Sequence, residues 1–278
     1  MSLTQHPQLD AVIAIARKAG EAILTVYNRP GDLSVQSKGD ESPLTEADLA
    51  SHHAIMEGLA ALPDQYPVMS EESTEQVGWD VRRNWERFWL VDPLDGTKEF
   101  VKRNGEFTVN IALIHKGRPL LGVVYVPVTG VTYAGLVGTG AWKIEGGNCA
   151  RIRVRDLAAA KAAGKPVIVA SRSHGGDKLE PLLKDIELKI GAFDTANLGS
   201  SLKICLVAEG RADLYPRLGP TSEWDTGAAQ AVLEAAGGAL LDPSLQPLPY
   251  NRGESVLNPH FVCIGDRSGS WDFLAGRL

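Results

Sequence analysis

The sequence is short of the features that mark several protein classes. It has three cysteines in 278 residues, Cys149, Cys205 and Cys263, which lie far apart and are odd in number. That argues against a disulfide framework and against a cysteine-type zinc site. No apolar run approaches the roughly 18 residues of a membrane span, and the N-terminus lacks the basic and then apolar layout of a secretion signal. We therefore expect a cytoplasmic protein, with peripheral contact on the cytoplasmic side of the inner membrane left open.

Basic charge is also scarce. The net charge is −6, whereas a general nucleic-acid binder usually carries a basic face, so we expect no nucleic-acid polymer as a partner. The histidines show no HExxH or other zinc spacing. Hydrophobic content of 44% and charged content of 22% are ordinary for a globular chain. The length suits one large domain or two modest ones.

The first half of the chain shows helices followed by strands. Apolar residues at helical spacing predict an amphipathic helix over 9–27. Thr45-Glu46-Ala47-Asp48 predicts a capping box that opens a second helix, to about Leu62. Short β-rich runs predict an antiparallel meander, at 109–114, 121–126 and 131–136. This half is therefore expected to be α+β.

The second half alternates between strands and helices. Strands are expected at 167–170, 188–193, 212–215, 239–241 and 261–264. Helices are expected at 178–184, 200–208 and 226–236. Such alternation is typical of an α/β layer. The Ala- and Lys-rich stretch at 157–165 is the candidate boundary, and the predicted domains are 1–158 and 159–278.

The most informative stretch is WLVDPLDGT, residues 89–97, which places Asp92 and Asp95 three residues apart after an apolar run. Phe88–Val91 predicts a buried strand, the next residues predict a tight turn, and a helix can begin at Thr97. A strand-to-helix turn of this kind can hold two carboxylates on hard cations, with backbone N–H groups behind them for a phosphate. Ordinary turn and capping chemistry would use the same residue types.

Further acidic residues stand at the ends of apolar elements. Glu71 and Glu72 follow a short apolar run, Asp225 lies where an Ala-rich helix begins, and Asp48 lies in the first turn of a helix. Each has an ordinary alternative as a solvated or helix-capping residue. Four carboxylates in one crevice would repel unless cations neutralised them, and Mg²⁺ is the usual remedy. The acids that can converge in this way are Glu71, Asp92, Asp95 and Asp225.

The segments Glu71-Glu72, DPLDGT at 92–97 and Trp224-Asp225, in this order, resemble the signature of the lithium-sensitive, magnesium-dependent inositol monophosphatase superfamily. Longer segments are most similar to its bacterial 3′(2′),5′-bisphosphate nucleotidase branch. They are 92–114, 199–217, 219–226 and Leu257-Asn258-Pro259. The likeness runs from about residue 10 to residue 265. It implies an α/β fold of the layered αβαβα sandwich type.

The resemblance also implies a role for each matching residue. Asp48 and Thr97 match the pair that orients the attacking water, and the N–H groups of Gly96 and Thr97 match those that hold the phosphate. Glu72 is an alternative to Glu71 as a ligand. The implied metal ligands are Glu71, Asp92, Asp95, Asp225 and the backbone carbonyl of Leu94. The implied substrate contacts are Glu71, Leu94, Asp95, Gly96, Thr97, Ser200, Lys203, Arg217, Asp225 and, more weakly, His174.

The activity implied by the resemblance is Mg²⁺-dependent removal of the 3′-phosphate of adenosine 3′,5′-bisphosphate, and of its sulfated analogue, in support of sulfate assimilation. About two or three Mg²⁺ ions and inhibition by Li⁺ are expected. An inositol or sugar monophosphatase of the same superfamily and a non-catalytic nucleotide or metal sensor are the alternatives. An aspartyl-phosphate mechanism is disfavoured because enzymes of that kind place their two aspartates two residues apart, whereas Asp92 and Asp95 are three residues apart. The protein is expected to be a monomer or a homodimer.

Overall fold

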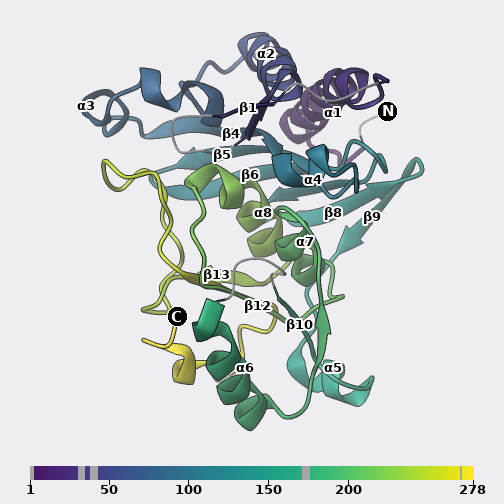
Figure 1. Ribbon diagram of the computed structural model, residues 1–278, viewed down its shortest axis with the longest axis vertical. Coiled ribbons are helices and arrows are strands. Elements are labelled where there is room, and N and C mark those ends of the chain that lie inside the picture. Colours follow the sequence, from purple (N-terminus) through teal and green to yellow (C-terminus); the bar gives the residue numbers. More distant parts are fainter. Residues whose placement is uncertain (1–2, 31–34, 38–42, 171–175, 270) are drawn as a thin grey trace.

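The computed structural model describes residues 3–30, 35–37, 43–170, 176–269 and 271–278. Within them, layers of helix, sheet, helix, sheet and helix follow one another, as the resemblance implied (Figure 1). The outer layer next to the first sheet consists of α1 (Pro7–Tyr27) and α2 (Glu46–Ala60). The middle layer is α7 (Leu202–Ala208) and α8 (Glu223–Ala235), and the last layer is α5 (Leu157–Ala162) and α6 (Gly176–Ile190).

The first sheet has the order β3-β4-β5-β6-β7-β8-β9. Its neighbours are antiparallel, except that β3 and β4 are parallel. The predicted meander is confirmed as β5, β6 and β7, and two more strands extend it. The bounds are β3 (Val68–Ser70), β4 (Arg87–Asp95), β5 (Thr108–His115), β6 (Arg118–Tyr125), β7 (Thr132–Leu136), β8 (Gly140–Glu145) and β9 (Asn148–Ile152). A separate antiparallel pair consists of β1 (Val35–Ser37) and β2 (Pro43–Thr45).

The second sheet has the order β11-β10-β12-β14-β13, with a parallel half and an antiparallel half. The strand expected at 188–193 is wrong, because α6 continues to Ile190. Leu182, Ile186 and Ile190 are buried at a spacing of four, so the helical face outweighs the β-rich composition. The bounds are β10 (Val167–Val169), β11 (Asp194–Ala196), β12 (Leu214–Arg217), β13 (Ala239–Leu241) and β14 (Phe261–Ile264).

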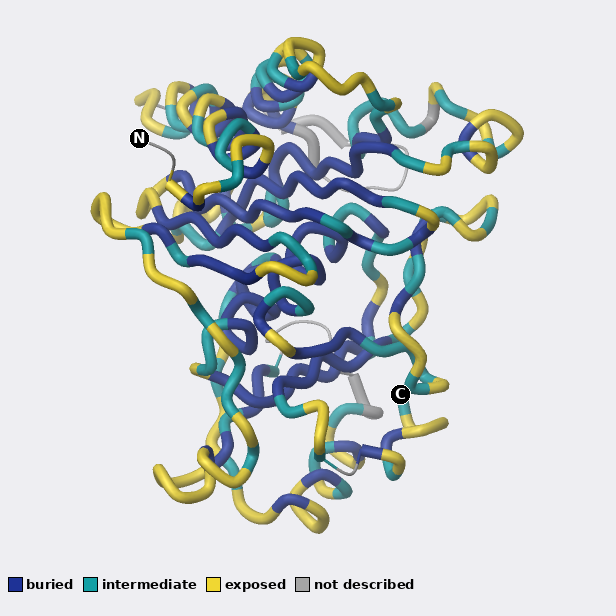
Figure 2. The backbone as a smooth tube through the Cα atoms, turned by 180° about the vertical axis from the view of Figure 1, so that it is seen from behind, coloured by how far each residue is buried: buried dark blue, intermediate teal, exposed yellow. Residues whose placement is uncertain are grey.

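The middle helix α8 lies unusually close to the first sheet. A Cβ atom at Gly122 in β6 would stand 2.2 Å from the carbonyl oxygen of Ala228, and one at Gly135 in β7 would stand 2.6 Å from the Cα of Val232. Glycine is therefore needed at both positions for the helix to approach. Buried residues fill the space on both sides of each sheet, while the outer helix faces and loops are exposed (Figure 2).

Short elements complete the upper half of the molecule in Figure 1: η1 (Glu71–Gln76), α3 (Trp79–Arg82) and α4 (Thr97–Val101), with η2 (Asp272–Leu274) near the C-terminus. Residues 157–162, where the sequence suggested a boundary, form α5, and the division into two domains stays a prediction. Among the described residues, none of the helices combines the length and the apolar character needed to cross a bilayer.

Candidate metal centre and active site

Three aspartates meet where β4 ends and α8 begins. Carboxylate oxygens of Asp92, Asp95 and Asp225 lie within 4.8 Å of one another. The tight turn expected after Val91 is wrong: β4 runs on to Asp95 and carries a bulge, because its register with β5 shifts between Asp92 and Asp95. Residues three apart on a regular strand face opposite sides, and the extra residue of the bulge brings both aspartates to the same side.

The charges in this cluster oppose one another. Burial, followed by the nearby carboxylates of Glu71, Asp95 and Asp225, raises the pKa of Asp92 well above its usual value. Glu71, the first residue of η1, also shares a side-chain hydrogen bond with Asp92. Burial and Asp95 raise the pKa of Asp225 to about 8. Carboxylates whose pKa is raised by burial and by one another are a fitting ligand set for a hard divalent cation, which would offset their charge.

Asp95 is held in place by residues that the sequence analysis missed. Its Oδ2 atom accepts hydrogen bonds from the backbone N–H of Ser201 at 2.5 Å, the Thr108 hydroxyl at 3.3 Å and the Asn110 amide at 3.3 Å. The Ser201 hydroxyl in turn donates to Asn110 at 3.0 Å. Thr108 and Asn110 are buried polar residues in the apolar strand β5, and that pattern was the available signal. The contact from Ser201 joins the two halves of the chain at a candidate ligand.

Asp48 and Thr97 come together from two different helices. Asp48 lies in the first turn of α2 and is completely buried. The hydroxyl of Thr97, the first residue of α4, donates to Asp48 Oδ1 at 3.4 Å and lies 3.4 Å from the carbonyl oxygen of Leu94. Gly96 precedes α4 in the left-handed conformation, with φ of 95°. The residues implied for water orientation and phosphate binding therefore stand beside the candidate metal ligands.

A cavity of about 270 Å³ opens from the aspartate cluster. Asp95 and Asp225 line it together with Lys203 and Arg217. Ser200 also lines it, with φ of 47°, and its buried hydroxyl has no hydrogen-bond partner in the part of the chain that the structure describes. The cavity thus combines anionic groups suited to cations with cationic and hydroxyl groups suited to phosphate.

The two buried cations are fixed by their surroundings. The Lys203 ammonium donates to the carbonyl oxygen of Leu198 at 3.1 Å and lies 5.9 Å from the centre of the Tyr215 ring. Burial lowers the pKa of Lys203, Asp95 opposes this, and Arg217 adds to it. Arg217 donates to the carbonyl oxygen of Pro220 at 2.9 Å. Much of the Arg217 guanidinium therefore stabilises the loop before α8, which the sequence did not suggest.

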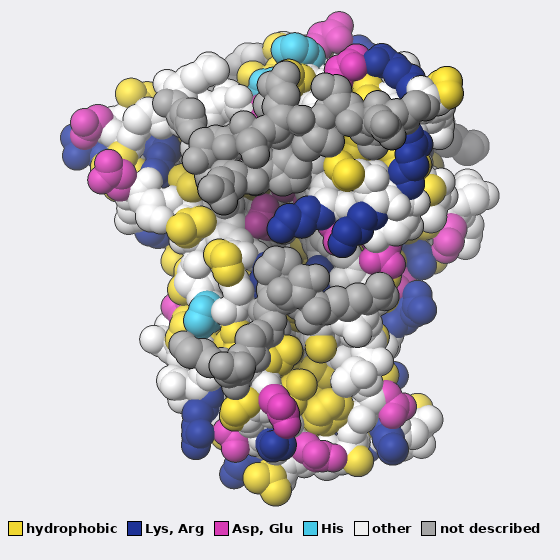
Figure 3. Space-filling view, viewed as in Figure 1, with side chains coloured by type: hydrophobic (Ala, Val, Ile, Leu, Met, Phe, Trp, Pro, Cys, Tyr) yellow, Lys and Arg dark blue, Asp and Glu magenta, His cyan; other side chains and the backbone are white. Residues whose placement is uncertain are grey.

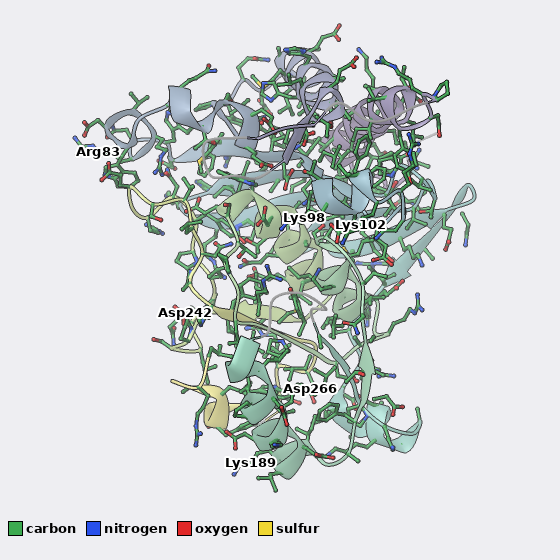
Figure 4. The ribbon with its side chains drawn as sticks, viewed as in Figure 1. Arg83, Lys98, Lys102, Lys189, Asp242 and Asp266 are labelled. Atoms are coloured by element: carbon green, nitrogen blue, oxygen red, sulfur yellow. The ribbon has the colours of Figure 1, made fainter. Side chains whose placement is uncertain are left out.

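Lysine also borders the outer part of the cavity. Lys102 lines it from the end of α4, and Figure 4 labels Lys102 and Lys98 on this helix. On the face drawn in Figure 3, Lys and Arg side chains lie beside Asp and Glu side chains at the level of α4. The face is thus of mixed charge around the cavity.

Glu72 and His174 are the remaining residues that the sequence analysis named. His174 lies outside the described residues. Glu72, the alternative to Glu71, lies near His52 of α2. Burial and His53 lower the pKa of the His52 imidazole, and the negative charge of Glu72 opposes this shift. Glu71 lies close enough to Asp92 for its charge to raise the pKa of that aspartate.

Comparisons with known proteins agree with the fold. The model of the inositol monophosphatase family matches residues 4–276. The 3′(2′),5′-bisphosphate nucleotidase CysQ of Escherichia coli strain K12 is 53% identical over 253 residues, which cover 91% of this chain and 98% of that protein. CysQ of Salmonella typhimurium is 51% identical with the same coverage. The crystal structure of CysQ from Bacteroides thetaiotaomicron, a member of the same family, has a TM-score of 0.82 at 43% identity and covers 95% of this chain and 99% of that one. The chain belongs to the inositol monophosphatase family.

Proposed function

We propose that this protein is a metal-dependent 3′(2′),5′-bisphosphate nucleotidase. It hydrolyses the 3′-phosphate of adenosine 3′,5′-bisphosphate to give AMP and phosphate, and it acts in the same way on the sulfated analogue, in support of sulfate assimilation. The observation that carries this proposal is one cavity lined both by Asp95 and Asp225, whose carboxylates cluster with that of Asp92, and by the cations Lys203 and Arg217. The relatives named CysQ support the choice of substrate.

The metal is Mg²⁺, held by Glu71, Asp92, Asp95, Asp225 and the backbone carbonyl of Leu94. Support comes from the donor set, which contains oxygen atoms alone, and from the burial that raises the pKa of Asp92 and Asp225. Bound there, about two or three ions would activate water and neutralise the charge that develops on the phosphoryl oxygens. We also propose that Li⁺ inhibits the enzyme.

The chain's own residues prepare the attack on phosphorus. Thr97 and Asp48 orient the water and take up its proton, since their side chains are within hydrogen-bonding reach of each other. The backbone N–H groups of Gly96 and Thr97 hold the scissile phosphate at the start of α4. The water oxygen then forms a bond to phosphorus as the bond to the ribose 3′-oxygen breaks, and that oxygen leaves with a proton from solvent.

The second phosphate of the substrate is bound on the other side of the cavity. Lys203 and Arg217 attract it by charge, and the Ser200 hydroxyl supplies a hydrogen bond. Lys203 is preorganised by its contacts with Leu198 and the Tyr215 ring. A substrate with a single phosphate would lack the second anionic group that these cations attract, and this is the basis for a preference for bisphosphates. Residue His174 is retained as a contact near the base.

The first test is phosphate release from adenosine 3′,5′-bisphosphate and from myo-inositol 1-phosphate, measured side by side with Mg²⁺ and then with added Li⁺. A strong preference for the nucleotide supports the proposal. A preference for inositol phosphate would keep the metal site and overturn the substrate assignment. Nucleotide binding without turnover would indicate a sensor, and phosphate release by Asp95→Asn at the wild-type rate would overturn the metal mechanism.

The substrate assignment has its own variant. Arg217→Lys keeps the positive charge but loses the bidentate geometry and the hydrogen bond to Pro220. Arg217→Ala loses the charge as well as these contacts. We expect Arg217→Ala to raise KM for the nucleotide bisphosphate by roughly 10- to 100-fold, the scale of a charged hydrogen bond, and to change KM for inositol 1-phosphate much less. Equal losses on both substrates would contradict a role in substrate choice. A cytoplasmic location, as the sequence suggested, and a monomeric or dimeric state complete the proposal.

A further inference from the structure

Thr45, the residue before α2, makes more contacts with Asp48 than a helix cap requires. Its hydroxyl accepts a hydrogen bond from the backbone N–H of Ala47 at 3.2 Å, which is the usual capping contact. The same hydroxyl donates to Asp48 Oδ2 at 2.6 Å. The backbone N–H of Thr45 donates to that oxygen at 2.8 Å. Thr45 has an exposed fraction of 2% and Asp48 of 0%, so these bonds are shielded from water.

These contacts fix the direction of the Thr45 proton. A hydroxyl has one proton to donate, and the Ala47 N–H occupies an acceptor position on Oγ1. The proton therefore points at Asp48 Oδ2. Two donors on one carboxylate oxygen fix the orientation of the Asp48 side chain. The other oxygen, Oδ1, is the one that Thr97 contacts at 3.4 Å.

We propose that Thr45 is a positioning residue for hydrolysis, which keeps Asp48 Oδ2 occupied and aims Oδ1 at Thr97. The inference rests on the function proposed above. The proton that leaves the attacking water goes to Asp48 Oδ1, directly or with the Thr97 hydroxyl passing on its own proton. Thr45 itself touches neither the water nor the phosphate, so it acts through the orientation of Asp48.

A purely structural role for Thr45 predicts a different outcome from a positioning role. As a helix cap, Thr45 would affect the stability of α2 and leave the rate of the folded enzyme unchanged. As a positioning residue, it would change kcat and leave KM unchanged, because Asp48 acts in the reaction and not in substrate binding. Asp156 offers a matched control, since its side chain caps α5 by accepting from the Ala159 N–H at 2.6 Å.

The experiment compares Thr45→Val, Thr45→Ser and Asp156→Ala by steady-state kinetics on adenosine 3′,5′-bisphosphate at saturating Mg²⁺ and by thermal unfolding. We expect Thr45→Val to lower kcat roughly 10- to 100-fold, the scale of a misplaced catalytic group, with KM within about twofold. Thr45→Ser, which keeps the hydroxyl, should recover kcat to within about threefold. Asp156→Ala should lower the melting temperature by an amount similar to Thr45→Val and keep the wild-type kcat.

Two results would overturn the inference: a kcat for Thr45→Val that stays near the wild-type value while its melting temperature falls, or a Thr45→Ser enzyme as slow as Thr45→Val. If Thr45→Val does not fold, Thr45→Gly takes its place, because glycine is tolerated at a helix cap and lacks the hydroxyl. Absence of nucleotide hydrolysis by the wild-type enzyme would contradict the proposed function instead. The same variants would then be compared on myo-inositol 1-phosphate, because Thr45 acts on the water and not on the nucleotide.

Discussion

Helices α2 and α8 begin in the same way and serve one site from opposite halves of the chain. In each, the residue before the helix donates its backbone N–H to an aspartate three residues later, at 2.8 Å in both cases. The pairs are Thr45 with Asp48 and Ser222 with Asp225. A capping box usually stabilises a helix start. Here the two boxes also orient two carboxylates that we place in the reaction.

The two boxes differ in what surrounds the carboxylate. Asp48 receives a second donor from the Thr45 hydroxyl, whereas Ser222 donates to Asp225 through its backbone N–H. Asp225 faces Asp95 and Glu71, and burial with these charges raises its pKa to about 8. The same local motif therefore gives one carboxylate that accepts two hydrogen bonds from Thr45 and one whose pKa is raised mainly by burial and by neighbouring carboxylates. A ligand role suits Asp225, because a bound cation would offset the negative charge of the neighbouring carboxylates.

The largest expected effect separates the two aspartates by their response to metal. Asp225→Asn should lower kcat/KM by roughly 10³-fold, and Asp48→Asn should lower it by roughly 10²- to 10⁴-fold. Only Asp225→Asn should also lose the rise in melting temperature that we expect Mg²⁺ to produce in the wild-type protein. Calorimetric unfolding with and without Mg²⁺ measures this. A full Mg²⁺ response in Asp225→Asn would contradict its assignment as a ligand.

The next effect is a pH dependence of metal stabilisation. The pKa of Asp225 is about 8 in the fold against 3.8 for an ordinary aspartate. The folded protein thus binds the proton more tightly than the unfolded chain, so without metal its stability falls as pH rises from about 4 to 8. In the metal site that we propose, Mg²⁺ would take the place of the proton, so the stabilisation by Mg²⁺ should grow across the same interval. Melting temperatures with and without Mg²⁺, taken between about pH 5.5 and 8.5, test this, and a constant difference would refute it.

A smaller effect is expected at the loop that supports the α8 box. Asn258 donates through its side-chain amide to the carbonyl oxygen of Ser222 at 2.7 Å and to the Thr226 hydroxyl at 3.1 Å. Asn258→Ala should destabilise the fold by about 1–3 kcal/mol, the cost of buried groups left without partners, and should weaken Mg²⁺ binding. Denaturant unfolding and a Mg²⁺ titration of the rate measure the two. Unchanged stability would show that this loop does not support the box.

The smallest effect is expected for Ser222→Ala. The backbone N–H of Ser222 remains in this variant, so its bond to Asp225 should persist. We expect a loss of about 1 kcal/mol or less in stability and a kcat within about twofold of wild type. This contrasts with the loss expected for Thr45→Val, where the hydroxyl itself contacts the carboxylate. A large loss of activity in Ser222→Ala would make the two boxes alike and remove the distinction between them.

Local patterns predicted short-range features near the candidate site better than they predicted some of the elements around it. The capping box at Thr45 to Asp48 and the helix start at Thr97 could be read from neighbouring residues, because such contacts span only a few positions. The end of α6 at Ile190 could not, because β-rich composition and helical spacing compete there. Ser201 and Asn110 donate hydrogen bonds to Asp95 although they lie 106 and 15 positions away from it in the chain. No local pattern reveals contacts of this kind.

The bulge in β4 makes the active site sensitive to chain length as well as to residue identity. Asp92 pairs with Asn110 and Asp95 with Thr108 on β5, so β4 has one more residue than β5 over this stretch. This extra residue brings the two aspartates to the same side of the sheet. Deletion of one residue between them would keep every carboxylate in the sequence, yet it would turn one of them to the opposite side of the sheet. An insertion at this point would do the same. A chain could thus lose its activity through a change in residue count alone, which an inventory of conserved residue types would fail to detect.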